Sequence, residues 1–216
     1  MYGLKDNVAR KTGTMGKEEN KEMEFWIQEE FQAFLECVAD KPISYYAFEI
    51  LYWTGIREGE LLALTPGDFN FEKKTLRINK SYQRLDVITD PKTPKSNRTI
   101  VMPDFLTIEM EDFIKSIYGI KMDDRIFTIS KSYLHHEMDR GAKLAGVKRI
   151  RIHGLRHSHI SLLINLGFSA LTIGERVGHE AVDITYHYAH LFPTVQTDMA
   201  AQLETEREAL VNVRKE

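Results

Sequence analysis

The sequence predicts a mainly helical domain with a small three-stranded antiparallel β-sheet, an α+β architecture. Up to residue 64 and again beyond residue 103, apolar residues recur with helical spacing; Phe31, Phe34, Leu35 and Val38, for example, form one helix face. Between residues 75 and 101, polar and apolar residues alternate instead, which is typical of strands. The sheet is therefore expected as an insertion after the third helix.

The individual elements follow from these periods and from the residues that interrupt them. Gly55 can adopt the left-handed cap that ends a helix, Pro66 follows the end of the next helix, and Asn70 and Asp90-Pro91 mark turns. We expect helices at 26–38, 43–53, 58–64, 104–118, 130–144, 153–166, 170–177, 183–189 and 193–211, and strands at 75–80, 82–88 and 98–101.

The composition indicates a globular protein that folds around a real core. Of the 216 residues, 43% are hydrophobic and 28% charged, which argues against disorder. Cys37 is the single cysteine, so an internal disulfide is excluded and a reducing cytoplasm is expected. No apolar run approaches the ~20 residues of a membrane-spanning helix, so no membrane partner is expected.

Charge is unevenly distributed along the chain. The net charge of −3 argues mildly against a nucleic-acid partner, but residues 17–40 are strongly acidic, whereas 73–100 and 140–160 are basic. An acidic outer face and a basic inner face would still bind a phosphate backbone. Scattered, solvated charges are the alternative interpretation.

The first polar motif is Thr54-Gly-Ile-Arg57-Glu-Gly-Glu60-Leu. Arg57 lies at the start of a predicted helix, where backbone N–H groups favour an anion, and its guanidinium adds bidentate phosphate recognition. Glu60, one turn later, could hold Arg57 in place. The alternative is an ordinary surface ion pair between residues three apart.

The second motif is His153-Gly-Leu-Arg156-His157-Ser-His159. His153 and Arg156 share a helix face, and a histidine beside a fixed cation suits proton transfer at a phosphoryl group. His157, four residues after His153, also raises a zinc interpretation. That interpretation is disfavoured, because a cation would lie between the ligands and the usual glutamate base is missing.

The third motif is Gly178-His179-Glu-Ala-Val-Asp-Ile-Thr-Tyr186-His-Tyr188-Ala-His190. A tyrosine nucleophile at a phosphodiester forms a phosphotyrosine ester and conserves the bond energy, so rejoining a strand needs no ATP. Because the phenol pKa is roughly 10, such an attack requires a base and a cluster of cations. Two nearby tyrosines on a helix that merely pack are the alternative.

Together the motifs resemble the tyrosine recombinase (phage-integrase) family. That family has R-x-x-E-L after a T-G turn, then H-x-x-R, then G-H and, nine residues later, the nucleophile, which selects Tyr188 rather than Tyr186. The family also places a catalytic lysine in a K-T-x-x-S-x-R-x-I hairpin, which here points to Lys92 rather than Lys95. The resemblance extends from about residue 26 to 193. Val177 replaces the usual Leu before G-H, a conservative apolar change.

The resemblance implies a role for each matching residue. Arg57 and Arg156 would clamp the scissile phosphate, and Tyr188 would attack it in line. His153 would assist transfer of the tyrosyl proton, and Lys92 would protonate the departing 5′-oxygen. His179 would complete the catalytic set by hydrogen-bonding to the phosphate, and Glu60 would have a supporting role, orienting the groups around it.

The implied function is that of a site-specific DNA recombinase, or integrase, acting through a 3′-phosphotyrosyl intermediate and a Holliday junction without metal or other cofactor. Expected partners are double-stranded attachment sites, three further protomers in a tetramer, and accessory DNA-bending or excision proteins. The bacterial cytoplasm, on the nucleoid, is the expected location. Backbone contacts with DNA are expected from Lys80, Arg84, Lys95, Arg98, Lys148 and Arg151.

Three segments are expected under this interpretation. Residues 1–22 resemble a linker from an absent N-terminal core-binding domain, which puts independent specific DNA binding in doubt. Residues 23–192 would form the catalytic domain. Residues 193–216 would form a C-terminal helix that packs either on a neighbouring protomer or back on its own domain.

Three alternatives remain open at this point. A type IB topoisomerase-like relaxer or a telomere resolvase would use the same chemistry with another outcome. A metal-dependent nuclease would use the histidines between 153 and 190, and it would be sensitive to chelators. A catalytically inactive DNA-binding regulator would retain the fold without the reaction.

Overall fold

The structure, a computed structural model, describes residues 24–83, 87–89, 97–178, 181–188, 191, 200, 203–205 and 207. Its helices are α2 (Gln28–Val38), α3 (Pro42–Thr54), α4 (Glu58–Leu61), α5 (Asp104–Ser116), α6 (Lys131–Ala145), α7 (Ile152–Asn165), α8 (Ala170–Val177) and α9 (Ala181–Tyr188), with a 3-10 turn η1 at Pro66–Asp68. The strands are β1 (Phe69–Asn70), β2 (Thr75–Ile78), β3 (Ser81–Tyr82), β4 (Ile88–Thr89) and β5 (Arg98–Val101).

The expected three-stranded antiparallel sheet is confirmed, but one of its strands differs from the expectation. Its order is β1-β2-β5, with Leu76 opposite both Phe69 and Ile100. The segment expected as the middle strand instead forms the separate pair β3–β4. Strand β1 was not predicted, because a two-residue strand is too short to show alternation.

Helix ends follow the local signals in the sequence. The Ser130 Oγ accepts a hydrogen bond from the Tyr133 N–H at the start of α6, and the Ser169 Oγ caps α8 in the same way. Gly55 and Gly178 adopt left-handed conformations, with φ of 66° and 72°, after α3 and α8. These caps fix the two turns from which the candidate site is built.

The helices expected before residue 190 are all present, although α4 ends three residues early. Leu64 lies beyond the end of the helix, and its carbonyl accepts the Ile126 N–H at 2.9 Å, a contact between distant segments. Of the helix expected at 193–211, only residues 200, 203–205 and 207 are described, and these are helical.

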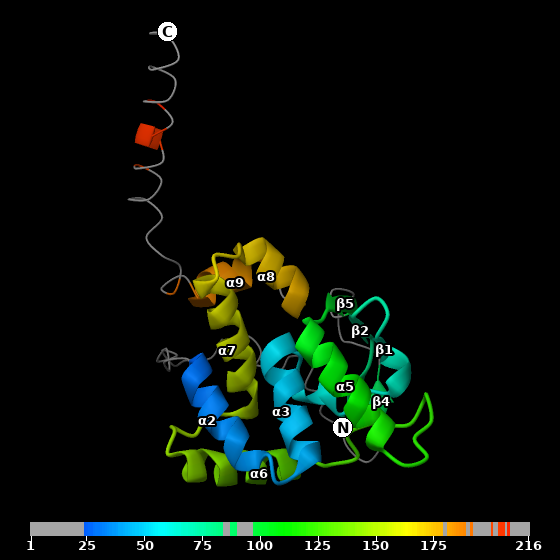
Figure 1. Cartoon of the computed structure of the whole chain (residues 1–216). Coiled ribbons are helices and arrows are strands. Elements are labelled where there is room, and N and C mark those ends of the chain that lie inside the picture. Colours follow the sequence, from blue (N-terminus) through cyan, green and yellow to red (C-terminus); the bar gives the residue numbers. More distant parts are fainter. Residues whose placement is uncertain are drawn as a thin grey trace, which may run out of the picture.

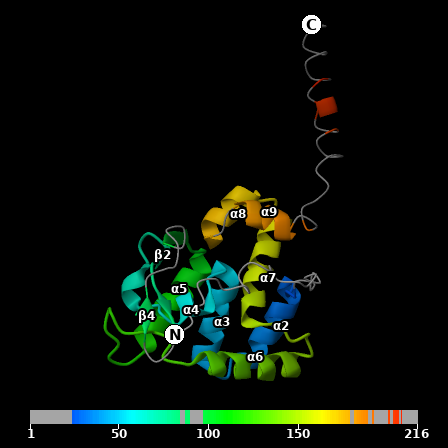
Figure 2. The ribbon, with the colours of Figure 1, turned by 180° about the vertical axis from the view of Figure 1, so that it is seen from behind.

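Helix α7 connects the two parts of the core (Figures 1 and 2). Its N-terminal half belongs to a large apolar cluster that it shares with α2, α3, α5, α6 and the sheet. Its C-terminal half contributes Ile160 and Ile164 to a small cluster with Ile173, Val177 and Tyr188 from α8 and α9. The candidate nucleophile therefore belongs to a separate layer at the far end of α7.

The start of α2 is anchored to α7 and to the turn before it. The Trp26 indole N–H donates to the Lys148 carbonyl at 2.6 Å, and the Trp26 backbone N–H donates to the Ser158 Oγ at 2.8 Å. Because the Trp26 side chain is also buried, this anchor fixes the first described residues against the core.

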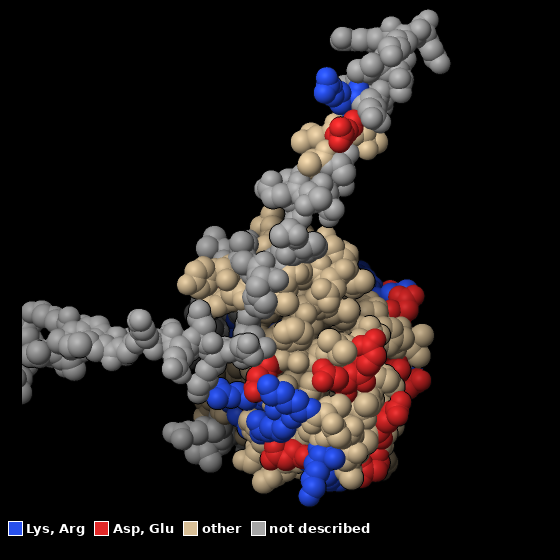
Figure 3. All heavy atoms as spheres, turned by 90° about the vertical axis from the view of Figure 1, so that its left-hand side faces the viewer, with Lys and Arg blue, Asp and Glu red and all other residues tan. Residues whose placement is uncertain are grey.

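On the face shown in Figure 3, a cluster of basic side chains lies among and beside acidic ones. Within the described part of the chain, no helix is long and apolar enough to span a membrane.

Candidate active site

The turn between α3 and α4 places Arg57 at the N-cap of α4. The Arg57 N–H donates to Glu60 Oε2 and its Nη1 donates to Glu60 Oε1, both at 2.9 Å. A Cβ on Gly55, whose φ is 66°, would lie 2.6 Å from the His159 Cδ2 atom. Glycine is therefore required here by both conformation and space, and the expected Arg57–Glu60 pair is confirmed.

Arg156, on α7, is a buried cation held by backbone carbonyl groups. Its Nη1 donates to the Gly55 carbonyl at 2.6 Å and its Nη2 to the Val177 carbonyl at 2.5 Å, while its Nε has no hydrogen-bond partner among the described residues. Burial, and then the nearby Arg57 and Arg98 cations, lower the pKa of Arg156 to about 9. Such a guanidinium would be stabilised by a bound anion.

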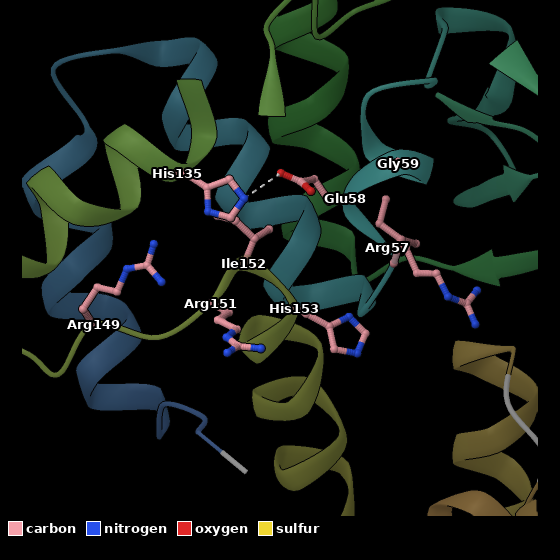
Figure 4. A pocket seen from close by; sticks show the side chains of 9 residues that line it. Arg57, Glu58, Gly59, His135, Arg149, Arg151, Ile152 and His153 are labelled. Carbon is pink, nitrogen blue, oxygen red and sulfur yellow. Dashed lines mark ion pairs between the residues drawn. The ribbon is translucent and has the colours of Figure 1, made fainter. Parts of the chain in front are cut away.

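His153 and Arg57 line the same pocket, which has a volume of about 460 Å³ (Figure 4). Arg151 and Arg149 also line it, and so does Glu58, whose carboxylate lies 3.7 Å from the His135 imidazole. Displacement of water by the surrounding protein, and then the Arg156 and Arg57 cations, lower the pKa of His153. The pocket thus brings three arginines together with His153, whose lowered pKa favours the neutral imidazole.

Tyr188, the last residue of α9, is only 2% exposed. Its hydroxyl forms a hydrogen bond with the Nδ1 atom of His157, not with His153. Burial raises the pKa of Tyr188, and the nearby Arg156 partly offsets this effect. Burial, and then the His153 and Arg156 charges, lower the pKa of His157 to about 4. Both partners of this hydrogen bond are therefore neutral near pH 7.

Glu60 connects Arg57 to a third arginine, Arg98 on β5. Burial alone would raise the pKa of Glu60, but hydrogen bonds and charge from Arg98 and Arg57 lower it overall. The Arg98 guanidinium donates to both Glu60 oxygens, at 3.2 and 2.9 Å, and its side chain is only 6% exposed.

The other described residues expected to contact DNA have varied surroundings. Lys80 pairs with the buried Asp68 at 2.6 Å, and Lys148 pairs with Glu24 at 3.0 Å. Arg151 is exposed at the start of α7 and has no side-chain partner among the described residues. Arg84, Lys92, Lys95 and His179 lie outside the described residues.

Two features of the site were not anticipated from the sequence. The motif around His157 suggested only a zinc ligand, although its position one turn after His153 places both side chains on the same face of the helix. No motif indicated Arg176, which donates to His159 Nε2 and to the Trp53 carbonyl. No group of three or more His, Cys, Asp or Glu side chains in the described part of the chain could hold a metal ion.

Known proteins share this sequence pattern. The phage integrase family matches residues 24–194. The ICEBs1 integrase of Bacillus subtilis (strain 168) is 32% identical over 217 residues, which cover 92% of this chain and 58% of that protein. A tyrosine recombinase XerC-like protein of Caldanaerobacter subterraneus is 27% identical, over 88% of this chain and 56% of that protein. The chain thus spans somewhat more than half the length of these relatives.

Solved structures share the fold. The Tn1549 transposon integrase, in a complex with circular intermediate DNA, superimposes with a TM-score of 0.70 at 22% identity, over 89% of this chain and 68% of that one. The catalytic domain of bacteriophage HP1 integrase gives a TM-score of 0.60 at 21% identity, over 84% of this chain and 95% of that one. With its site geometry and a family match over most of its length, the chain belongs to the phage integrase family.

Proposed function

We propose that the chain is the catalytic domain of a site-specific DNA recombinase, an integrase that cuts and rejoins DNA through Tyr188. The observation that supports this most directly is the buried Arg156 guanidinium. It lies near Arg57 and close enough to Tyr188 to influence its pKa, and its Nε lacks a partner among the described residues. A phosphate held by these two arginines would meet the tyrosyl oxygen.

In the proposed reaction, Arg57 and Arg156 bind the non-bridging oxygens of one phosphodiester. The Tyr188 oxygen attacks the phosphorus and its proton leaves, a P–O bond to tyrosine forms, and the P–O5′ bond breaks. The products are a 3′-phosphotyrosyl strand and a 5′-hydroxyl that has gained a proton. The cations stabilise the charge that develops in the pentacoordinate state, which is usually the largest catalytic contribution.

Three residues complete this proposal. His153 assists the transfer of the tyrosyl proton, as its place in the pocket beside Arg57 supports. Lys92 protonates the 5′-oxygen, and His179 binds the phosphate; both assignments rest on sequence motifs alone. Attack by the 5′-hydroxyl of a second duplex reverses the chemistry and leads through a Holliday junction to recombinants. No metal or nucleotide is required.

The proposed partners are double-stranded attachment sites, further copies of the chain in a tetramer, and accessory DNA-bending or excision proteins. The complex of the related Tn1549 integrase with DNA supports the first of these. Residues 23–192 would form the catalytic domain, 1–22 a linker and 193–216 a C-terminal helix. Action on the nucleoid in the bacterial cytoplasm follows from this function.

Among the residues expected to contact the DNA backbone, Arg84, Lys95, Lys148 and Arg151 remain proposals. Arg151 has the best support, because it lies at the edge of the pocket that Arg57 and His153 line (Figure 4). Lys80 is less suited to DNA binding, because it already neutralises the buried Asp68.

The decisive experiment is covalent trapping on a nicked duplex that contains the junction of the element's ends. Wild type, Tyr188→Phe and Tyr186→Phe are incubated with the duplex, with and without chelator, and separated under denaturing conditions. We expect a covalent protein–DNA species that survives chelator and disappears only with Tyr188→Phe. Tyr186 is a matched control, since it lies on the same helix with 79% exposure.

Each other result points to a different conclusion. If the covalent species disappeared only with Tyr186→Phe, the proposed reaction would stand, but Tyr186 and not Tyr188 would be its nucleophile. Strand cleavage without a covalent species, abolished by chelator, would replace the proposal with the metal-dependent nuclease. Binding without any cleavage would favour the inactive regulator.

A further inference from the structure

Three arginines converge on the C-terminal end of α8. Arg98 Nε donates to the Arg176 carbonyl at 2.9 Å, Arg156 Nη2 to the Val177 carbonyl at 2.5 Å, and Arg57 Nη2 to the Gly178 carbonyl at 3.4 Å. The last carbonyl groups of a helix have no partner within the helix and bear a partial negative charge. Three consecutive carbonyls at this terminus thus gather three like charges that would otherwise repel one another.

Of these three cations, Arg98 has its guanidinium directed at Glu60 and the C-terminal end of α8. Its Nε and both Nη atoms are engaged by the Arg176 carbonyl and the two Glu60 oxygens, and its side chain is only 6% exposed. A guanidinium in this environment cannot reach a DNA backbone without giving up Glu60. The DNA contact expected for Arg98 from the sequence is therefore not supported by its geometry.

Glu60 is shared between Arg98 and Arg57. Each of its oxygens accepts one hydrogen bond from each arginine, and its side chain is only 5% exposed. Without Arg98, the full charge of Glu60 would act on Arg57 and draw its guanidinium away from a bound phosphate. With Arg98, the three arginines and one carboxylate leave two positive charges, which match the doubly negative pentacoordinate phosphate.

We propose that Arg98 is a positioning residue of the reaction: by holding Glu60 from β5, it keeps the Arg57 guanidinium available to the phosphate. This inference rests on the proposed function, and it replaces a DNA-binding role for Arg98 with an indirect role in the chemical step. Arg98 acts through Glu60 and the α8 terminus and does not touch the substrate.

The test compares Arg98→Gln and Arg98→Lys with Arg77→Gln. Arg77 is the matched control, because it lies on the neighbouring strand β2 with a side chain that is 56% exposed. We measure the affinity for the nicked duplex at several salt concentrations and the rate of covalent complex formation at saturating protein. Circular dichroism and thermal unfolding verify that each variant is folded.

We expect both Arg98 variants to bind DNA within about twofold of wild type with an unchanged salt dependence. The covalent step should be slower by about 100-fold in Arg98→Gln, since a small misplacement of a catalytic group has an effect of this size. In Arg98→Lys the covalent step should still be at least about tenfold slower than in the wild type, because one ammonium group cannot contact both Glu60 oxygens and the Arg176 carbonyl. Adding Glu60→Gln to Arg98→Gln should cause little further loss, since the two residues act through one contact.

A direct DNA contact predicts the opposite result. Arg98→Gln would then weaken DNA binding and reduce the slope of log affinity against log salt concentration by about 0.9 in magnitude. Arg98→Lys would restore both the affinity and this slope. That outcome, or a normal covalent rate in either folded Arg98 variant, would overturn the positioning role.

Binding of inorganic orthovanadate, a mimic of pentacoordinate phosphate, separates this proposal from the proposed function. If the wild type forms no covalent complex, the proposed function fails, and calorimetry with orthovanadate still decides the role of Arg98. We expect Arg98→Gln to weaken orthovanadate binding by about tenfold or more and Arg77→Gln to leave it unchanged. Wild-type affinity in Arg98→Gln, or no detectable binding in the wild type, would refute the inference.

Discussion

The hydroxyl group of Tyr188 is hydrogen-bonded to a neutral imidazole inside the protein. His157 provides this contact, and the apolar side chains of Ile160, Ile164, Ile173 and Val177 surround the ring. A neutral pair in an apolar layer is stable, but it keeps the phenol protonated and away from solvent. The structure therefore has the proposed nucleophile in a protected state, from which a bound phosphate would have to attract it.

Protection of Tyr188 can be measured directly at the level of the residue. In the wild type at pH 8 we expect tetranitromethane to nitrate Tyr186, which is 79% exposed, at least about tenfold faster than Tyr188, which is 2% exposed. His157→Leu removes the hydrogen-bond partner of the Tyr188 hydroxyl and should reduce the difference between the two nitration rates, whereas His157→Asn retains a polar partner and should preserve it. Mass spectrometry of the peptide that contains both tyrosines gives the ratio, and equal nitration in the wild type would contradict the protected state.

At the scale of the element, the turn between α3 and α4 determines where the two arginines proposed to bind the phosphate lie. It presents Arg57 at the start of α4, and its Gly55 carbonyl accepts the Arg156 Nη1 group. The His159 ring packs against Gly55 from α7. The position of the turn is thus fixed by a contact between α3 and α7 that leaves no room for a side chain.

Gly55→Ala should destabilise the fold through two effects. A left-handed alanine costs about 1 kcal/mol, and the clash with His159 adds roughly 1–3 kcal/mol. Gly146→Ala is the matched control, because Gly146 caps α6 with φ 68° and a Cβ there would meet no atom within 4 Å. Thermal unfolding should show a clearly larger loss for Gly55→Ala, and equal losses would mean that the His159 contact is unimportant.

At the scale of the whole molecule, stability should depend on pH through a carboxyl group remote from the site. Glu49 on α3 is only 4% exposed, and its Oε2 has no hydrogen-bond partner among the described residues. Burial, and then the negative charge of Glu109 on α5, raise the pKa of Glu49 to about 7; a hydrogen bond from Trp53 opposes this. The packing of α3 on α5 therefore favours the protonated form.

The sign of the pH effect follows from this raised pKa. Between pH 4.5 and 7 the folded state binds more protons at Glu49 than the unfolded state does, so the free energy of unfolding falls as pH rises. Glu49→Gln should remove this dependence and stabilise the protein at pH 8 by on the order of 2 kcal/mol, with little change near pH 4.5. Urea denaturation at both pH values measures the effect, and Glu29→Gln, at an exposed position, is the control. Equal stability of the wild type and Glu49→Gln at pH 8 would argue against a buried ionised carboxylate.

Local patterns in the sequence were sufficient to predict most of the elements and to select candidate site residues that the structure places close together. The helical period, the glycine caps and the serine caps depend on neighbouring residues only, so α2, α3 and α5 to α9 could be predicted within a few residues. The short strand β1 could not, because two residues are too few to show an alternating pattern. The early end of α4 could not either; there the Leu64 carbonyl accepts a hydrogen bond from the distant Ile126 N–H. Arg57, Glu60, Arg156 and Tyr188 follow from motif spacing, and the structure brings them together.

By itself, the sequence determined the helical class with its small sheet and a family motif set with its expected nucleophile. Only the tertiary structure decided what each polar side chain touches: His157 rather than His153 contacts Tyr188, and Arg98 contacts Glu60. Arg98 and Glu60 are 38 residues apart, and Arg156 and the Gly55 carbonyl are 101 apart. Spacing along a chain specifies which residues share a helix face, but contacts between elements depend on how the core packs them.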